Sequence, residues 1–342
     1  MNFFTIGDFL ARLLLFLLPR RISNRIRENT SPLEVYVLRT ATMKSNEPRM
    51  TLFEGVFATL LFDMALFGTS NAIINGIISF FTRIQNSWDT PFTSEEEATA
   101  KVTEFCNRLD IQQQPWIWEK EKQSYSSLND FFSRTYAPQH FPKIGDGQLV
   151  SPACCKIQSF VNDESMKSIL IKGCNYDVAN IGLPEEDLDA YRKNRVILGY
   201  LSPKDYHRVH APISGKVVHC KMEGFDSPSA SVKFFGGKFN LLNENKRLVI
   251  VLEEEGGEQG VDEEPLRVAL VIIGGVGVNT ITYDTQMIGK SIPKGHELSA
   301  FRAGGSAFAL FTTKTMDILY PLQKAAEQRV HVETLVGETL AH

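Results

Sequence analysis

The spacing of apolar residues divides the chain into an N-terminal part with helical periodicity and a C-terminal part that resembles β-strands. In residues 52–67, LFEGVFATLLFDMALF, apolar side chains recur three and four positions apart, which predicts an amphipathic helix. Residues 94–109 show the same spacing, and Ser94 precedes Glu97 by three positions, a capping-box pattern that predicts a helix start. From Pro138 onward, short apolar runs are broken by glycine, proline and asparagine, as in β-rich chains.

Two apolar runs in the C-terminal part predict a hairpin. They cover residues 248–252 and 266–273 and are joined by a polar, acidic loop. Together these patterns predict an α+β protein. A helical N-terminal region over residues 1–135 is expected to pack on or beside a mainly antiparallel β-sheet catalytic domain over residues 136–342.

One weak internal similarity links two segments of the β-rich part. SPACCKI (151–157) and APISGKV (211–217) share a proline, a small residue, and then lysine with a β-branched residue. The similarity predicts two strands that begin alike in one β-structure. Chance is the alternative, because seven-residue similarities are common and no longer repeat supports this one.

The first ninety residues raise the question of a membrane. The clean apolar run Leu13–Leu18 falls far short of the ~20 residues that span a bilayer. Arginines follow this run, whereas a secretory signal carries its positive charge before the apolar stretch. Two interpretations stay open: the N-terminal helices pack on the protein's own core, or they lie in a membrane interface with the arginines near anionic headgroups.

The composition limits the kinds of binding partner, metal site and cellular compartment that can be expected. With 43% apolar and 22% charged residues, the 342-residue chain has the composition of a globular protein. A net charge of −4 and the lack of a basic stripe argue against a nucleic-acid partner. Five cysteines without ligand spacing argue against a disulfide framework and a structural zinc site, and favour a reducing, intracellular compartment.

Two segments carry candidate chemistry. LSPKDYHRVHAP holds Asp205, His207 and His210 within six positions, and histidine is the side chain best suited to move protons near neutral pH. A metal site would need a third ligand, which no nearby residue supplies convincingly. In RAGGSAFALF, Gly304 and Gly305 precede Ser306, which permits a tight turn or an exposed peptide carbonyl. The G-x-S-x-G pattern of serine hydrolases is absent there.

Five motifs resemble those of the phosphatidylserine decarboxylase family in order and approximate spacing. They are DFFSR (130–134), LVSPA (149–153), KGCNY (172–176), LSPKDYHRVHAP (201–212) and GGSAFALF (304–311). The resemblance covers residues 125–320 and is most specific in the double-histidine motif and the late Gly-Ser pair.

The resemblance implies a proenzyme that cuts itself between Gly305 and Ser306. The Ser306 hydroxyl would attack the Gly305 carbonyl, with His210 as its base. Gly304 and Gly305 would let the peptide bend while nearby N–H groups stabilise the oxyanion. Chains 1–305 and 306–342 would stay packed together, and Ser306 would become a pyruvoyl group.

That covalent pyruvoyl group is the implied cofactor, and no separate organic cofactor is expected. It would form an imine with the substrate amine and accept the electron pair released with carbon dioxide. The resemblance assigns His207 to protonating the resulting carbanion, and Asp205 and Tyr206 to shaping or polarising the site. It also implies a tendency to form homodimers.

The chain departs from the family at two adjacent positions, where Cys154 stands in place of an aspartate and Cys155 in place of a glycine. Members acting on phosphatidylserine usually have SPADG where this chain has SPACC, so Cys154 replaces the aspartate that orients the cleavage histidine. Loss of an orienting carboxylate costs several orders of magnitude in a comparable triad. Three explanations stay open: Asp205 substitutes, Cys154 orients His210 as a thiol or thiolate, or self-processing is slow or absent.

The substrate implied first is phosphatidylserine at a phospholipid membrane surface, favoured by the apolar N-terminus, the arginines and the intact double-histidine motif. The expected location is an intracellular membrane, such as the mitochondrial inner membrane or an endomembrane. The SPACC segment also resembles the soluble branch of the family that decarboxylates free aromatic amino acids such as tryptophan. The third alternative is a membrane-associated scaffold that never matures.

Overall fold

The computed structural model describes most of the chain beyond residue 86 and two short N-terminal strands. The described residues are 33–38, 42–47, 87–109, 111, 117–160, 168–171, 174–202, 204–224, 246–255, 264–274, 281–302, 306–327 and 330–342. The predicted helix over residues 52–67, the arginines after Leu18, and Gly304 and Gly305 lie outside these ranges.

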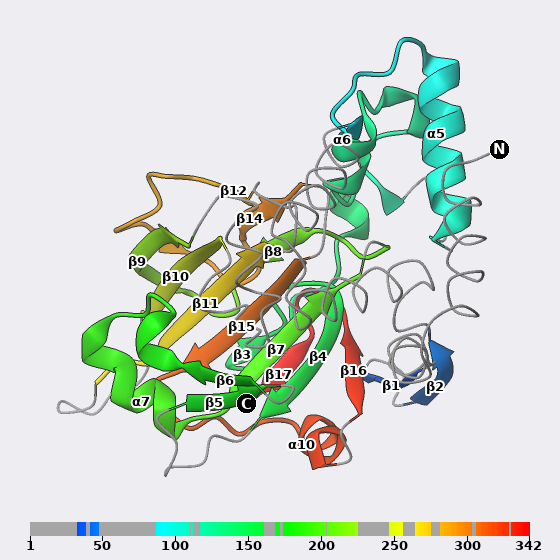
Figure 1. Cartoon of the computed structure of the whole chain (residues 1–342). Helices are drawn as coiled ribbons and strands as arrows, with labels where there is room; N and C mark the ends of the chain where they lie inside the picture. The colour runs from blue at the N-terminus through cyan, green and yellow to red at the C-terminus, as the bar shows by residue number, and fades with distance from the viewer. Residues whose placement is uncertain are drawn as a thin grey trace, which may run out of the picture.

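A ten-stranded sheet forms the centre of the protein (Figure 1). Its order is β13 (Ser291–Ile292), β9 (Gly215–Glu223), β10 (Arg247–Glu254), β11 (Arg267–Gly274), β15 (Ser306–Thr312), β7 (Val196–Leu201), β4 (Cys155–Phe160), β16 (His331–Thr334), β1 (Leu33–Val37) and β2 (Thr42–Glu47). Neighbouring strands are antiparallel except β1 and β16. The β10–β11 pairing confirms the predicted hairpin, and the mixture of sheets and helices confirms the α+β class.

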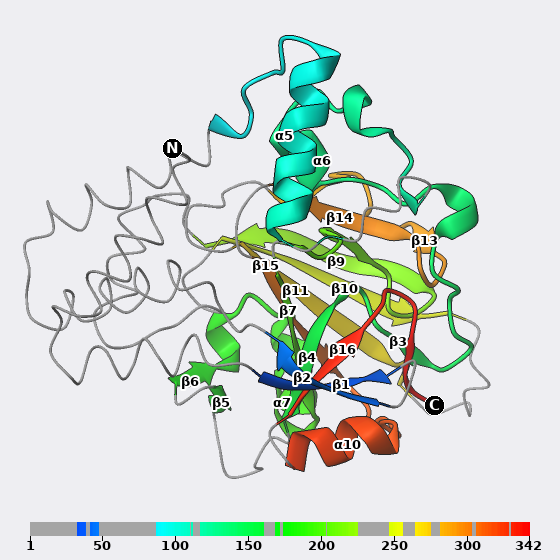
Figure 2. The same cartoon turned by 90° about the vertical axis from the view of Figure 1, so that its right-hand side faces the viewer.

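Smaller elements surround this sheet. In the described ranges, three further sheets consist of β12 (Ile281–Tyr283), β14 (Glu297–Phe301) and β8 (Arg208–His210); β17 (Thr339–Ala341) and β3 (Leu149–Val150); and β5 (Ser168–Ile171) and β6 (Cys174–Asp177). The described α-helices are α5 (Glu95–Arg108), α6 (Leu128–Phe132), α7 (Leu188–Lys193) and α10 (Tyr320–Glu327). Figure 2 shows α5 and α6 at the opposite end of the molecule from α10.

The middle of the sheet is buried on both faces. In β10, Leu248, Ile250 and Leu252 belong to one apolar cluster, while Val249 and Val251 belong to another. A strand covered on both faces reads as a continuous apolar run instead of an alternating one. This explains why the sequence of β10 shows no polar face.

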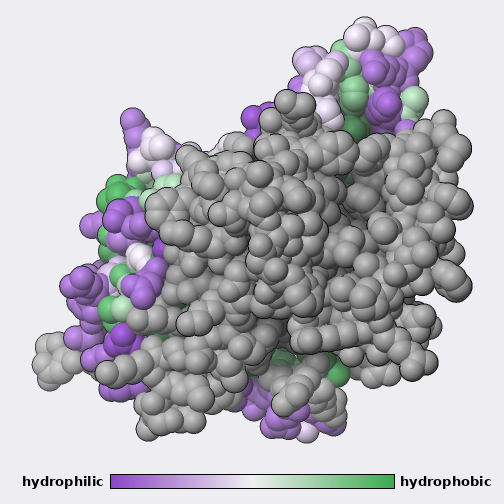
Figure 3. All heavy atoms as spheres, in the orientation of Figure 1, coloured by the Kyte–Doolittle hydropathy of each residue, from purple (hydrophilic) through white to green (hydrophobic). Residues whose placement is uncertain are grey.

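The capping-box prediction at α5 is confirmed. The Ser94 hydroxyl accepts a hydrogen bond from the Glu97 backbone N–H, 3.2 Å away. The helix buries Val102 and Phe105 against α6, where the Phe105 and Phe131 rings meet edge to face. In Figure 3, the upper lobe that contains α5 shows hydrophilic and near-neutral residues with a hydrophobic strip between them. Among the helices that the structure describes, none combines the length and apolarity needed to cross a bilayer.

The N-terminal region is not helical throughout, in contrast to the expectation for residues 1–135. Strands β1 and β2 form a hairpin at the sheet edge, and β1 pairs in parallel with β16. A sheet edge presents unpaired N–H and C=O groups, so a short extended segment can add to it regardless of its position in the chain. The division at residue 135 stays a prediction.

Candidate active site

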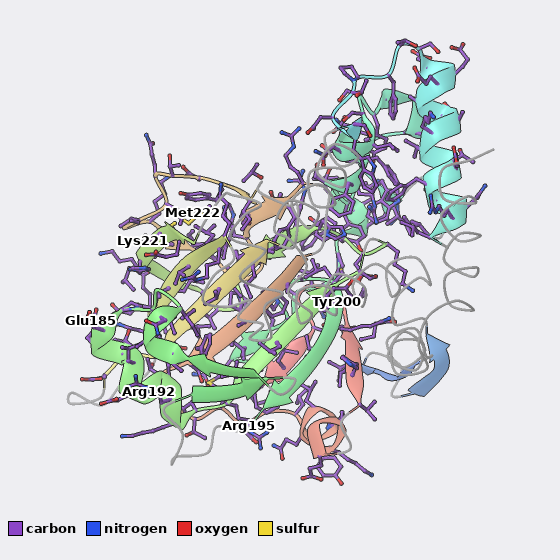
Figure 4. All side chains as sticks on the ribbon, viewed as in Figure 1. Glu185, Arg192, Arg195, Tyr200, Lys221 and Met222 are labelled. Carbon is purple, nitrogen blue, oxygen red and sulfur yellow. The ribbon has the colours of Figure 1, made fainter. Side chains whose placement is uncertain are left out.

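Ser306 is the first residue of β15, and its backbone lies between two strand ends. It pairs with Leu201, the last residue of β7, and with Gly274, the last residue of β11. After Leu201 the chain enters the double-histidine segment, residues 202–210. In Figure 4, the label Tyr200 marks this end of β7, and Arg195, the residue just before β7, marks the other end. The sheet register therefore places the Ser306 backbone at the start of the double-histidine segment.

The chain before Ser306 approaches the same segment from its other side. Phe301, the last residue of β14, donates its backbone N–H to the His207 carbonyl at 2.9 Å. Phe301, just before the predicted cleavage segment, and Ser306, within it, thus lie beside His207 and Leu201, respectively. The structure brings together the two motifs that the sequence singled out separately.

His210 is buried, and both of its ring nitrogens have partners. Its Nδ1 lies 2.9 Å from the Gly295 carbonyl oxygen, and its Nε2 lies 3.1 Å from the Tyr206 hydroxyl. Since a carbonyl only accepts, we assign the proton to Nδ1, which leaves the Nε2 lone pair to accept from Tyr206. Burial lowers the pKa of His210 to about 4, although the Gly295 hydrogen bond opposes this shift. His210 is therefore a neutral base at physiological pH.

In the described part of the chain, neither residue suggested as a replacement for the missing aspartate is among the hydrogen-bond partners of His210, which are Gly295 and Tyr206. The Cys154 sulfur lies 3.6 Å from the Tyr136 hydroxyl and accepts from the Val336 N–H at 3.4 Å. Burial raises the pKa of Cys154 to about 11, so the group is a thiol at neutral pH. Its thiolate form is thereby disfavoured. The His210 ring is held instead by the Gly295 carbonyl and the Tyr206 hydroxyl.

The Asp205 carboxylate is engaged within its own loop. Its Oδ2 accepts from the Ser202 backbone N–H at 2.7 Å and from the Ser202 hydroxyl at 2.8 Å. Burial raises the pKa of Asp205, while these two hydrogen bonds act in the opposite direction. The contact closes the turn that leads into the histidines, and this geometry is consistent with the shaping role predicted for Asp205.

The His207 side chain is fully buried and firmly held. Its Nε2 donates to the Ser202 carbonyl at 3.0 Å, and its ring stacks on Phe132. The ring centroids are 3.7 Å apart. His207 and His210 therefore lie on one loop but have different surroundings, as expected if they act in different steps.

Arg134, a buried residue of the DFFSR motif with no role predicted from the sequence, anchors this loop. One guanidinium nitrogen donates to the Lys204 carbonyl at 2.7 Å and to the Asp205 carbonyl at 3.0 Å. The guanidinium also lies over the Trp118 ring, 4.5 Å from its centroid. Its position in DFFSR was the only signal, because backbone carbonyl partners leave no trace in a sequence.

A second arginine, Arg208, extends from the loop and binds the DFFSR segment. Arg208 donates through Nε and Nη2 to the Ser133 carbonyl at 2.9 and 2.8 Å, and it forms an ion pair with Glu297 on β14 at 2.6 Å. The DFFSR segment, the double-histidine segment and β14 are therefore linked by direct polar contacts.

The two similar segments noted in the sequence lie side by side. The Val150 N–H donates to the Pro212 carbonyl at 3.0 Å, and the His210 N–H donates to the Pro152 carbonyl at 2.8 Å. The strands that follow, β4 and β9, begin at Cys155 and Gly215 in the same sheet, which confirms the predicted strand starts. This reciprocal pairing also fixes the backbone of His210.

Within the described ranges, no group of three or more histidine, cysteine, aspartate or glutamate side chains is arranged to hold a metal ion.

Comparison with known proteins identifies the family. Residues 128–342, more than half of the chain, match the family model described as phosphatidylserine decarboxylase. Similar curated proteins are named phosphatidylserine decarboxylase proenzyme. The one from Fusobacterium nucleatum is 26% identical over 74% of this chain and 82% of its own length. The one from Halalkalibacterium halodurans is 28% identical over 66% of this chain and 83% of its own length. This chain belongs to the phosphatidylserine decarboxylase family.

Proposed function

We propose that this protein is a phosphatidylserine decarboxylase proenzyme that cuts its own chain between Gly305 and Ser306. The names of its relatives support the substrate and the proenzyme character. The observation that carries the proposal is the pairing of Ser306 with Leu201, which sets the serine at the start of the segment that holds a neutral His210.

Cleavage begins when the Ser306 Oγ attacks the Gly305 carbonyl carbon. The serine proton passes to the Tyr206 oxygen as the phenol proton passes to His210 Nε2, because a phenol both donates and accepts. As the tetrahedral intermediate collapses, protonated His210 returns its proton to the Ser306 nitrogen, the Gly305–Ser306 C–N bond breaks, and an ester and a free Ser306 amine form. His210, neutral again, then takes the Ser306 Cα proton as the Cβ–O bond breaks, which leaves a Gly305 carboxylate and a dehydroalanine. Water converts this residue to a pyruvoyl group and releases ammonia.

The buried position of β15 supports an assembly in which the two chains stay together. Ser306–Thr312 is bonded to β7 and β11 on its two sides, and Phe308, Leu310 and Phe311 are fully buried. Burying an aromatic or leucine side chain stabilises by about 1.5–3 kcal/mol. Cutting the peptide before Ser306 removes none of these contacts.

The decarboxylation itself would draw on the same loop. Once formed, the pyruvoyl group supplies an electron sink for the departing carbon dioxide. Proton delivery is assigned to His207, and the contacts of its ring with Ser202 and Phe132 support this assignment. A shaping role is assigned to Asp205 and Tyr206, supported by the hydrogen bonds of Asp205 with Ser202 and of Tyr206 with His210. The enzyme would act at a phospholipid surface, where its substrate lies; a homodimer stays a prediction.

The test compares wild-type protein with Ser306→Ala on a denaturing gel and in carbon dioxide release assays. Wild type is expected to give two chains and to decarboxylate phosphatidylserine in vesicles but not free tryptophan. Ser306→Ala should stay uncut and inactive, because no hydroxyl remains to attack Gly305. Cleavage of Ser306→Ala would refute the proposed scission. Activity on tryptophan alone would indicate an amino-acid decarboxylase, and an uncut, inactive wild type would indicate a scaffold.

A further inference from the structure

We propose that the backbone carbonyl of Gly295 orients His210 for self-cleavage, in the place that a carboxylate side chain would otherwise take. Gly295 is thus a positioning residue that acts through His210. This inference rests on the proposed function, because it assigns a role within the cleavage step. It starts from the 2.9 Å contact between His210 Nδ1 and the Gly295 oxygen.

The turn that carries this carbonyl requires glycine. The His296 N–H donates to the Pro293 carbonyl at 3.0 Å, which closes a four-residue turn with Gly295 at its third position. The φ angle of Gly295 is 83°, in the region that residues with a Cβ rarely adopt. The turn residue is therefore chosen for its backbone conformation.

The same turn is bonded on both sides to the residue that follows His210. The Gly295 N–H donates to the Ala211 carbonyl, and the Ala211 N–H donates to the His296 carbonyl, each at 2.8 Å. These bonds fix the turn against the backbone of the histidine. The distance from the Gly295 oxygen to the imidazole is consequently set by four backbone groups and not by a mobile side chain.

A side chain at this position would disturb the carbonyl. A Cβ on Gly295 would lie 2.6 Å from both Cδ1 and Cγ1 of Ile144. An alanine would therefore add steric overlap to an unfavourable φ angle. Both effects act on the peptide unit whose oxygen holds His210.

A carbonyl replaces only part of what a carboxylate does. It accepts the Nδ1 proton and so fixes the tautomer with a free Nε2 lone pair, which is the form a base needs. It carries no full negative charge to stabilise the imidazolium that forms when Nε2 takes a proton. Self-cleavage is thus supported without Asp at position 154.

The first test compares the self-cleavage rates of Gly295→Ala and Gly289→Ala in pulse-chase synthesis. Gly289 is a matched control, because its φ angle is also 83° but a Cβ there would meet no atom within 4 Å. Gly295→Ala is expected to slow cleavage by roughly tenfold to hundredfold, as for a small misplacement of a catalytic group. Gly289→Ala should cleave close to the wild-type rate. Equal rates for the two variants would overturn the proposal.

The second test is independent of cleavage and uses the uncut Ser306→Ala protein. NMR of the histidine ring nitrogens, with His210 assigned from a His210→Gln variant, should show a neutral ring protonated at Nδ1. Adding Gly295→Ala should change this signal, whereas adding Gly289→Ala should not. A ring protonated at Nε2 in uncut protein would overturn the inference. If wild type is never cut but the NMR result holds, the proposed function fails while the positioning of His210 stands.

Discussion

The ring of Phe132 stacks on the imidazole of His207, with an angle of 23° between the two planes. Phe132 comes from α6, and His207 comes from the loop between β7 and β8, so two distant parts of the chain form one side of the site. The helical part is therefore a component of the predicted active site and not only a neighbour of the sheet.

Replacing Phe132 with leucine should impair decarboxylation more than folding. The variant loses the ring that holds His207, and we expect kcat to fall about tenfold with little change in KM, as for a loosened proton donor. Phe105→Leu is the matched control, since Phe105 is also buried but packs on Trp88 and Phe131. Both variants should lose about 1–2 kcal/mol of unfolding free energy. Equal kcat values in the two variants would show that the stacking of Phe132 on His207 does not contribute to decarboxylation.

Arg134→Lys should slow self-cleavage and destabilise the fold. Lysine cannot reproduce the guanidinium contacts with Lys204, Asp205 and Trp118, and we expect a loss of about 2–3 kcal/mol in denaturant unfolding. Arg192→Lys changes an exposed ion pair with Asp189 and should cost less than about 0.5 kcal/mol. Self-cleavage of Arg134→Lys at the wild-type rate would argue against an anchoring role for Arg134.

Cys154→Ala should leave the rate of self-cleavage nearly unchanged. The Cys154 sulfur contacts Tyr136 and Val336 and is a buried thiol, so its removal should cost only about 1 kcal/mol of stability. Cys106→Ala, which removes another buried thiol, gives the comparison for folding effects. The accumulation of the 306–342 chain measures the outcome. Strongly slowed cleavage in Cys154→Ala alone would restore the hypothesis that this cysteine activates His210.

The pH dependence of the unfolding free energy should reveal the low pKa of His210. Its pKa is about 4 in the folded protein and near 6.5 in the unfolded chain, so below about pH 6.5 the unfolded state binds more protons. The stability contributed by the neutral ring is complete above that pH and is lost as the pH falls toward 4. In uncut Ser306→Ala protein, adding His210→Gln should flatten this part of the curve in thermal unfolding. An unchanged slope would contradict the low pKa.

The sequence predicted the elements that local rules determine. The Ser94 capping box, the β10–β11 hairpin and the similar starts of β4 and β9 follow from short-range patterns, and the structure confirms them. Strand β1 escaped prediction because its pairing with β16 joins residues almost 300 positions apart, and no local signal encodes that partner.

The sequence named candidate residues for the site, but it did not predict the contacts between them. The double-histidine motif and the late Gly-Ser pair marked His210 and Ser306, whereas the sheet register that joins them emerges only from tertiary pairing. The Gly295 carbonyl was missed for a simple reason. A backbone oxygen has the same chemistry at every residue, so only the fold shows which one reaches a histidine.

Intact-mass spectrometry of the small chain tests the central claim most directly. If the Ser306 hydroxyl attacks the Gly305 carbonyl and a pyruvoyl group forms, the fragment of residues 306–342 will be lighter by one ammonia than the same fragment beginning with serine. A ketone-specific reagent will also label this fragment. A catalytically active preparation in which the Gly305–Ser306 bond is intact, or in which the small chain begins with unmodified serine, would contradict the claim.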